Sequence, residues 1–272
     1  MTSRWDVALV ATLFGEDIRA GIPRLVEAGV DSIEVLLPCP VPERAPNDDA
    51  GICEAVLSAG IAVNSIHAPF GAEYDLAAPS PEVRSGALAA HVEALDLCTL
   101  CGTDLMVVHA GHHTEQGRED EFTARALDSM RLLIPEAERR GVRLAVENLP
   151  PDHLTPSAAA LAEFVDELDD CVVGACLDTG HAEFTGGAVA ATELLGPRIV
   201  TVHAHDNDGT GDQHLMPGHG VIDWAGVGAA LRATGYARPI VLELRCPEGY
   251  TPARMEEEFT RLIESPLPPG ES

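Results

Sequence analysis

The residues best suited to chemistry lie in the 25-residue segment from Val200 to Trp224, which reads VTVHAHDNDGTGDQHLMPGHGVIDW. It begins as a β-branched strand and continues as a glycine-rich loop that carries four of the chain's eleven histidines. The residues of this segment that we single out are His203, His205, Asp206, Asp212, His214 and His219. Imidazole and carboxylate together are ligands of Zn, Mn, Fe or Co. The segment therefore predicts a metal site; taken alone, it also fits a polar surface loop.

The elements that would position these residues follow a regular alternation of apolar, strand-like runs and amphipathic helical runs. We expect strands at Val7–Leu13, Ser32–Leu36, Ala62–His67, Asp104–His109, Arg143–Glu147, Val172–Asp178, Ile199–His203 and Ile240–Leu244. We expect helices at Ile18–Ala28, Asp48–Ala59, Pro81–Cys101, Glu119–Arg140, Pro156–Leu168, Val189–Leu194, Trp224–Thr234 and Pro252–Ile263. Glycine follows five of these helices, where a left-handed cap residue is required.

This order is typical of parallel βα units with both faces of the sheet covered. Eight such units predict the α/β class and a closed (β/α)8 TIM barrel, as one domain over residues 1–264 with a disordered tail at 265–272. An open, doubly wound sheet is the alternative. It is disfavoured because no G-x-G-x-x-G turn follows the first strand.

Polar side chains end seven of the eight expected strands. They are Glu34, His67, His109, Glu147, Asp178, His203 and Glu243. In these barrels the chemistry takes place at the C-terminal ends of the strands. One such residue alone could be a helix cap or a hydrogen-bonded buried group, but several buried carboxylates in one ring repel one another unless cations lie between them. The pattern therefore predicts a divalent metal centre.

Composition excludes several classes of function. The chain has 17 basic and 44 acidic residues, a formal charge of −27, which disfavours nucleic acid and anionic membranes as partners. It has no lysine, which excludes Schiff-base aldolase chemistry and lysine-bound pyridoxal phosphate. No signal peptide or membrane-length apolar run is present, and Cys98 and Cys101 are expected to be packing residues, so we expect a cytoplasmic protein.

Several motifs resemble the xylose isomerase-like barrel superfamily over nearly the whole chain. They are Val146-Glu147-Asn148, Leu177-Asp178-Thr179-Gly180-His181, Pro217-Gly218-x-Gly220-x-Ile222-Asp223-Trp224 and Glu243. This superfamily holds sugar and sugar-phosphate isomerases and epimerases, inosose dehydratase and endonuclease IV. The motifs do not select one member.

The resemblance to the ketose isomerases and epimerases implies one divalent ion, Mn²⁺ or Zn²⁺, bound by Glu147, Asp178, His203 and Glu243. It also implies that the two glutamates exchange protons with a small sugar or polyol carbonyl compound, through an enediolate that the ion stabilises. His181 would contact the substrate or bind a further ion; its alternative role is to cap a helix. A dehydratase-like lyase is the neighbouring alternative, and a non-enzymatic metal-storing barrel is another.

The three-zinc pattern of endonuclease IV is matched as well, which allows up to three ions. The additional ligands implied by that pattern are His67, His109, His181, Asp212 and His214. With a single ion, His67 and His109 become substrate contacts instead. A hydrolase is thus a further alternative, although the net charge and the absence of lysine disfavour a DNA substrate.

The remaining candidates lie around the expected mouth of the barrel. We expect Arg245 to bind an anionic group of the substrate or to neutralise the carboxylate ring. Trp224 is expected to wall the pocket; this expectation is shared with Phe14, Phe70 and Phe184, which can equally be packing residues. We expect a supporting role for Glu34. His112, His113, His205 and His219 are extra candidates near the mouth, and we expect them to support ligands or face solvent rather than bind metal; no role is assigned to His91 and His153. The sequence leaves open whether the protein forms a homo-oligomer.

Overall fold

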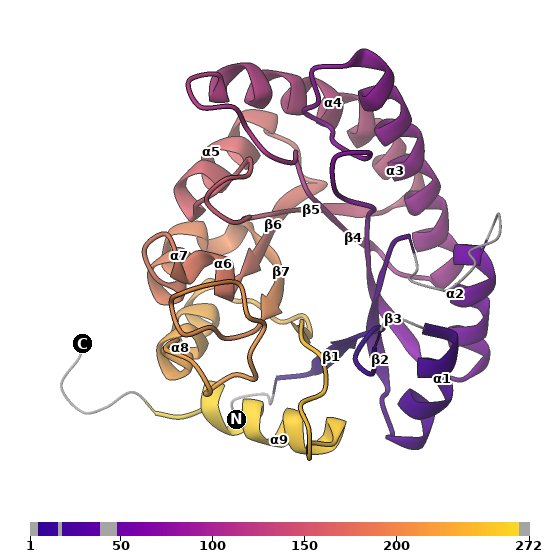
Figure 1. Ribbon diagram of the computed structural model, residues 1–272, viewed down its shortest axis with the longest axis vertical. Helices are drawn as coiled ribbons and strands as arrows, with labels where there is room; N and C mark the ends of the chain where they lie inside the picture. Colours follow the sequence, from indigo (N-terminus) through magenta and orange to yellow (C-terminus); the bar gives the residue numbers. More distant parts are fainter. Residues whose placement is uncertain (1–4, 16–17, 39–47, 267–272) are drawn as a thin grey trace.

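The computed structural model describes residues 5–15, 18–38 and 48–266, so residues 267–272 of the predicted tail lie outside the described part. Eight parallel strands close into a barrel in sequence order, with β1 paired to β8. Figure 1 looks into this barrel, with the helices packed around it. The predicted (β/α)8 TIM barrel is therefore confirmed.

The strands agree closely with the ranges expected from the sequence. They are β1 (Val7–Val10), β2 (Ser32–Leu36), β3 (Ala62–His67), β4 (Leu105–Val108), β5 (Arg143–Glu147), β6 (Val173–Asp178), β7 (Ile199–Ala204) and β8 (Ile240–Leu242). Strands β1, β4, β6 and β8 are shorter than expected. Strand β7 is one residue longer than expected.

The helices surround the barrel in the expected order. They are α1 (Ile18–Glu27), α2 (Asp48–Ser58), α3 (Pro81–Cys101), α4 (Glu119–Arg140), α5 (Ala158–Leu168), α7 (Ala188–Leu195), α8 (Trp224–Thr234) and α9 (Pro252–Ile263). The short helix α6 (Thr179–Glu183) and the 3-10 turn at Gly196–Arg198 were not expected. Among the described residues, no helix is both long and apolar enough to cross a membrane.

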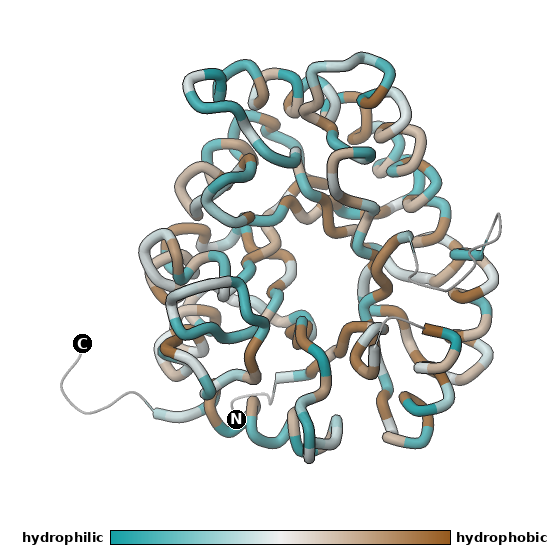
Figure 2. Tube along the Cα trace, viewed as in Figure 1, coloured by the Kyte–Doolittle hydropathy of each residue, from teal (hydrophilic) through white to brown (hydrophobic). Residues whose placement is uncertain are grey.

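The hydrophobic core lies mainly between the outer face of the barrel and the surrounding helices. Inside the barrel are two small apolar clusters, one formed by Leu105, Val107, Ala145, Cys176 and Val200 and the other by Ala8, Val10 and Val241. Figure 2 shows hydrophilic residues gathered in the connecting loops. Cys98 and Cys101 are buried free thiols, as expected for packing residues.

Side-chain alternation along the strands places a polar layer next to this inner apolar layer. Ala145 and Glu147 are two residues apart in β5, as are Cys176 and Asp178 in β6, so each pair lies on the same face of its strand. The apolar partner packs inside the barrel and the acidic partner lies one layer nearer the C-terminal rim. The strands thus direct carboxylates into the mouth of the barrel.

Helices α8 and α9 pack closely through Gly228, and this contact yields a stability prediction. A Cβ atom at residue 228 would lie 2.0 Å from the carbonyl oxygen of Ile263, so Gly228→Ala must separate the two helices. We expect it to lower the free energy of unfolding by about 1–3 kcal/mol in chemical denaturation. Gly86→Ala is the matched control, because its Cβ would meet no atom within 4 Å in α3. Equal stability of the two variants would contradict the prediction.

Candidate metal centre

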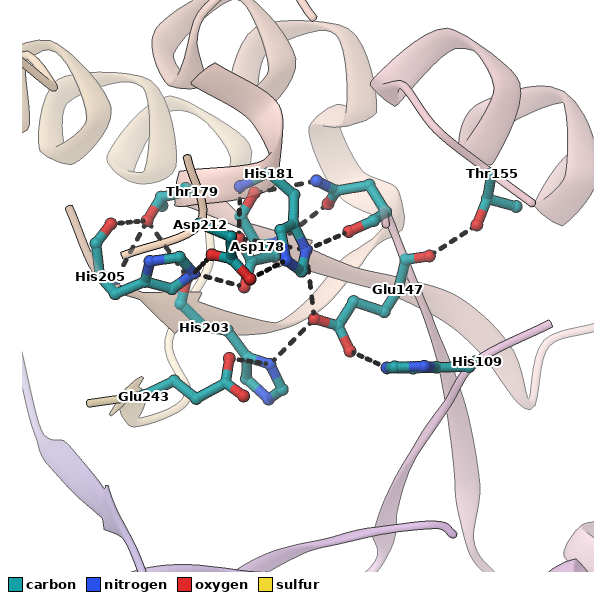
Figure 3. Close-up of polar contacts among 12 residues, drawn as sticks. His109, Glu147, Thr155, Asp178, Thr179, His181, His203, His205, Asp212 and Glu243 are labelled. Atoms are coloured by element: carbon teal, nitrogen blue, oxygen red, sulfur yellow. Dashed lines mark hydrogen bonds and ion pairs between the residues drawn. The ribbon is translucent and has the colours of Figure 1, made fainter. Parts of the chain in front are cut away.

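Glu147, at the end of β5, is the hub of the first group of ligand-type side chains. It is 2% exposed, and its Oε2 lies 3.3 Å from His67 Nε2. The same oxygen lies 3.1 Å from His109 Nε2 (Figure 3). The ring of His67 is oriented by its Nδ1, which lies 2.8 Å from the Ala68 carbonyl oxygen. The Glu147 backbone carbonyl accepts a hydrogen bond from Thr155 Oγ1 at 2.8 Å. His67, His109 and Glu147 thus form one potential metal-binding set.

Asp178, at the end of β6, begins a second group. Its backbone is held by Asn148, which directly follows the neighbouring strand β5; the Asn148 side-chain amide donates to the Asp178 carbonyl and accepts from its N–H, both at 2.9 Å. Asp178 Oδ1 accepts from the His181 N–H at 2.7 Å and so caps helix α6. The other oxygen, Oδ2, lies 3.0 Å from His205 Nε2. Asp178, His181 and His205 form a second potential set.

Asp212 brings the His181 and His214 side chains together in a third group. Asp212 Oδ2 lies 3.3 Å from Nε2 of each histidine. The Nδ1 of His181 lies 2.9 Å from the Asn148 carbonyl oxygen, and that of His214 lies 2.6 Å from the Glu243 carbonyl oxygen. Backbone carbonyls that hold Nδ1–H leave Nε2 as the coordinating atom, which is the usual orientation of a metal-binding histidine.

The structure places His205, rather than His203, beside Asp178 and Asp212. Both histidines point into the barrel because they are two residues apart, but β7 ends at Ala204, so His205 lies at the strand end. Thr179 holds the His205 backbone through its hydroxyl, and a Cβ at Gly180 would lie 2.0 Å from the His205 ring. The expected one-ion set contained His203, which lies beside Glu147 and Glu243, whereas the imidazole beside Asp178 is that of His205. In the sequence, the spacing of two residues between His203 and His205 was the signal that both side chains point to the same face of the strand.

His203 lies deeper in the barrel, where carboxylates surround it. Its Nε2 lies 3.1 Å from Glu34, and its Nδ1 lies 3.0 Å from Glu243 Oε2 and 3.3 Å from Glu147 Oε1. Glu34 also accepts a hydrogen bond from Ser65 Oγ at 2.7 Å. Although burial opposes protonation, the surrounding negative groups raise the pKa of His203 well above its usual value. His203 therefore balances the charge of these carboxylates.

Trp224 does not line the pocket. Its side chain is buried against Phe259, with ring centroids 5.4 Å apart, and its indole N–H donates to Asp206. This corrects the expectation that it walls the substrate site. Phe70 is 44% exposed and its ring lies 5.1 Å from that of His67 and 4.8 Å from that of His109, so it covers the first group.

Asp206 organises the loop that carries Asp212 and His214. Its fully buried carboxylate accepts hydrogen bonds from the N–H groups of Asn207, Gly218 and Ile222 at 2.8–3.2 Å, and from Trp224 Nε1 at 3.0 Å. One carboxylate thus satisfies donors from both ends of a long loop. Sequence reasoning missed this role, because the donors are distributed over eighteen residues of the chain.

A cavity of about 340 Å³ opens beside the third group. Its lining includes Thr12, Gln213, His214, Glu243 and Arg245. Arg245 is exposed and also borders a neighbouring cavity of about 390 Å³. Its place at the mouth agrees with the expected position, and the anion-binding role remains a prediction.

The carboxylates change the protonation of the imidazoles beside them. Burial opposes the change, but Asp178 and then Asp212 raise the pKa of His181 to about 10. In the same way, Asp212 and Glu243 raise the pKa of His214 to about 9 against the effect of burial. Burial alone would raise the pKa of Asp178, but the neighbouring His181 and His205 lower it to about 2. The mouth of the barrel thus has a strong affinity for positive charge.

The donor set fits a divalent metal ion. Nitrogen and oxygen ligands at bond lengths of about 2.0–2.2 Å stand about 3.3 Å apart around a tetrahedral ion. The imidazole–carboxylate distances of 3.0–3.3 Å in the three groups are close to this spacing. In addition, His205 Nδ1 is buried without a hydrogen-bond partner. These residues can hold Zn²⁺, Mn²⁺ or a similar cation.

Comparison with known proteins finds relatives across much of the chain. The model of the family described as xylose isomerase-like TIM barrel matches residues 22–264. The D-psicose 3-epimerase of Ruminiclostridium cellulolyticum is 27% identical over 240 residues, covering 84% of this chain and 78% of the relative. An uncharacterized protein of Sinorhizobium fredii is 29% identical over 211 residues, covering 69% and 68%. A probable endonuclease 4 of Mycobacterium tuberculosis is 29% identical over 230 residues, covering 79% and 85%.

Solved structures share the fold at lower identity. The crystal structure of a D-tagatose 3-epimerase-like protein superposes with a TM-score of 0.79 at 23% identity, covering 96% of both chains. That of the IolI protein with a bound zinc atom gives 0.75 at 18% identity, covering 96% of this chain and 95% of the other. At these identities the likeness shows the architecture of the barrel.

Asp206 offers a test of how the metal-binding loop is held. We expect Asp206→Asn to lower the free energy of unfolding by at least about 3 kcal/mol, because an amide cannot satisfy all four donors, and to weaken metal binding at Asp212 and His214. Trp224→Phe is the control, since it removes only one of the four hydrogen bonds. Denaturant unfolding and metal titration measure the two effects. An Asp206→Asn protein with unchanged stability would contradict this role.

The pKa values of His181 and His214 predict the stability of the metal-free protein against pH. Both are raised from 6.5 in the folded state, to about 10 and about 9, so their contribution is complete below pH 6.5 and is lost as the pH rises through these values. We expect the Tm of chelator-treated protein to fall between pH 6.5 and pH 10. Metal-loaded protein should show a smaller fall, because the ion replaces the protons. A constant Tm without metal would contradict the prediction.

Proposed function

Since the chain belongs to the xylose isomerase-like TIM barrel family, we propose that it is a divalent-metal-dependent isomerase or epimerase of a small polyhydroxylated carbonyl compound. The observation that carries the proposal is the convergence of two acidic side chains from the ends of β5 and β8, two strands that are not neighbours in the barrel. Glu147 Oε1 and Glu243 Oε2 lie 3.3 Å and 3.0 Å from the same nitrogen of His203. The relative named D-psicose 3-epimerase supports this class of substrate.

Four residues would hold the central ion in this proposal: Glu147, Asp178, His205 and Glu243. A bound divalent ion would polarise the carbonyl and the adjacent hydroxyl of the substrate, which acidifies the hydrogen on the carbon between them. The protein supplies the rest of the chemistry. The zinc atom of the structurally similar IolI protein is compatible with a cation at such a site.

The two glutamates are suited to move the proton. Burial alone would raise their pKa values, but His203 dominates and lowers both, so both are carboxylates at neutral pH. One carboxylate would remove the carbon-bound proton and later release it to solvent, and the other would return a proton that it has taken up from solvent. Return to the opposite face gives epimerisation, and return to the neighbouring carbon gives isomerisation. His67, His109 and Arg245 lie where they can contact substrate oxygens.

A metal-dependent hydrolase is the second candidate. It is favoured by the groups around Asp212 and around His67, which a one-ion enzyme does not require as ligands and which would allow two or three ions. The relative named probable endonuclease 4 points the same way. The excess of 44 acidic over 17 basic residues opposes a DNA substrate, so a small substrate is the better match.

The test combines metal content with hydrogen exchange at carbon. We expect metal-loaded protein to incorporate solvent deuterium into at least one member of a panel of ketoses and inososes. Glu147→Gln and Glu243→Gln should each lower the exchange rate by about 10²–10⁴-fold, because each removes one acid/base group. Glu248→Gln, at an exposed glutamate in the same segment as Glu243, should leave the rate unchanged.

The alternatives give different results in the same experiment. Loss of water from an inosose would indicate the lyase. Cleavage of abasic-site DNA or of a small phosphodiester, with no deuterium in any sugar, would overturn the proposal in favour of the hydrolase. Protein that binds no divalent ion would contradict both.

A further inference from the structure

Three histidines that belong to none of the groups above meet at the rim of the barrel. His112 and His113 follow β4, and His153 follows β5. Their ring centroids are 4.1 Å apart for His112 and His113, 4.3 Å for His113 and His153, and 5.1 Å for His112 and His153. One ring nitrogen from each lies within 4.8 Å of the other two. Imidazoles from two separate segments thus converge on one point.

Backbone pairing between the two segments brings these rings together. His113 and His153 form an antiparallel bridge. On either side of it, the Leu154 N–H donates to the His112 carbonyl at 3.2 Å and the Thr114 N–H donates to the Asp152 carbonyl at 3.3 Å. The histidines therefore stand on a short ladder rather than on independent loops. Because the backbone is held, only the side chains of these histidines need to move for all three to contact one ligand.

Carboxylates orient the imidazoles. Asp152 contacts Nδ1 of two rings, with Oδ1 at 2.9 Å from His153 and Oδ2 at 3.2 Å from His113. A carboxylate that accepts from Nδ1–H leaves the Nε2 lone pair of each ring available, as in most metal-binding histidines. Asp75 Oδ1 holds the third residue through the backbone N–H of His112 at 3.1 Å. Asp152 itself is 69% exposed, so it is accessible to solvent.

The surroundings of His112 and His153 favour the neutral imidazole, which is the form that binds metal. Burial and the neighbouring rings of His113 and His153 lower the pKa of His112. Burial also lowers the pKa of His153. A cavity of about 660 Å³ between α4 and α5 has His153 in its wall together with the acidic residues Glu119, Asp120, Glu163 and Glu167, which attract cations.

We propose that His112, His113 and His153 form a separate binding site for a divalent transition-metal ion of imidazole preference, with Zn²⁺ as the representative. Three nitrogen ligands and one water complete the four-coordinate sphere of such an ion. Bond lengths of about 2.0–2.1 Å require ligand nitrogens about 3.3 Å apart. Rotations of the imidazole rings that move their nitrogens by about 1 Å therefore complete the site. The half-exposed side chain of His113 has room for this movement.

Occupation of this rim site joins the two segments that support the first ligand group. The segment after β4 begins with His109, and the segment after β5 contains Thr155, which donates to the Glu147 carbonyl. An ion shared by His112, His113 and His153 therefore restrains both. The rim site shares no ligand with the metal centre and does not depend on the proposed function.

The experiment is a zinc titration of chelator-treated, full-length protein by equilibrium dialysis, with bound metal measured by elemental mass spectrometry. We expect a tight class of sites and a weaker class of one additional Zn²⁺ per chain. The double variant His113→Asn/His153→Asn should lose the weaker equivalent and retain the tight class. His219→Asn, at a histidine near the mouth that pairs with Tyr250, is the matched control and should retain both.

A conservative variant keeps the test informative if the double variant folds poorly. Asp152→Asn keeps all three imidazoles and removes only the exposed carboxylate, so it should weaken the additional site by about 10–100-fold while the tight class is unchanged. Cu²⁺ bound at the additional site should show an electron paramagnetic resonance spectrum of nitrogen ligation that the double variant lacks. Equal zinc stoichiometry in wild type and double variant, or loss of the same equivalent in His219→Asn, would overturn the proposal.

Discussion

The crowding of buried carboxylates at the C-terminal end of the barrel is the constraint on which the rest of the structure depends. Glu34, Glu147 and Asp178 are at most 2% exposed, and they lie in a space that the strands cannot enlarge. Ionised carboxylates in such a place are costly unless positive charge lies between them. The imidazoles provide that positive charge either by being protonated or by binding a cation. The charge balance of this site and its proposed affinity for metal have the same physical origin.

The fold meets this constraint by fixing each group from outside the ring. Asn148 links the ends of β5 and β6, Thr179 holds the His205 backbone, and Asp206 gathers the donors of the long loop after β7. None of these three needs to touch a substrate. They keep the orientation of the coordinating side chains independent of loop motion, which a site with several ligands requires.

Two kinds of histidine environment occur at the same end of the barrel. The histidines of the metal centre lie against carboxylates that raise the pKa values of His181 and His214. At the rim, imidazoles face one another, and the pKa values of His112 and His153 are lowered. We expect a buried, carboxylate-rich site to bind a cation in competition with protons, whereas His112 and His153 would offer neutral nitrogens to an ion at the rim. This contrast follows from which residue types each strand end carries.

The sequence by itself determined the barrel, nearly all element ranges, and which ligand-type side chains end the strands, because hydrophobic periodicity and strand-end position are local properties. The family suggested by the motifs is also confirmed. Tertiary structure alone decided that His205 rather than His203 lies beside Asp178, that Trp224 is packed inside, and that His153 meets His112 and His113. The hydrophobic pattern of the sequence is the same whether a strand ends one residue earlier or later, and whether or not two loops pair with each other. The positions of these side chains depend on contacts between segments that are distant in the sequence, and these contacts form only when the barrel closes.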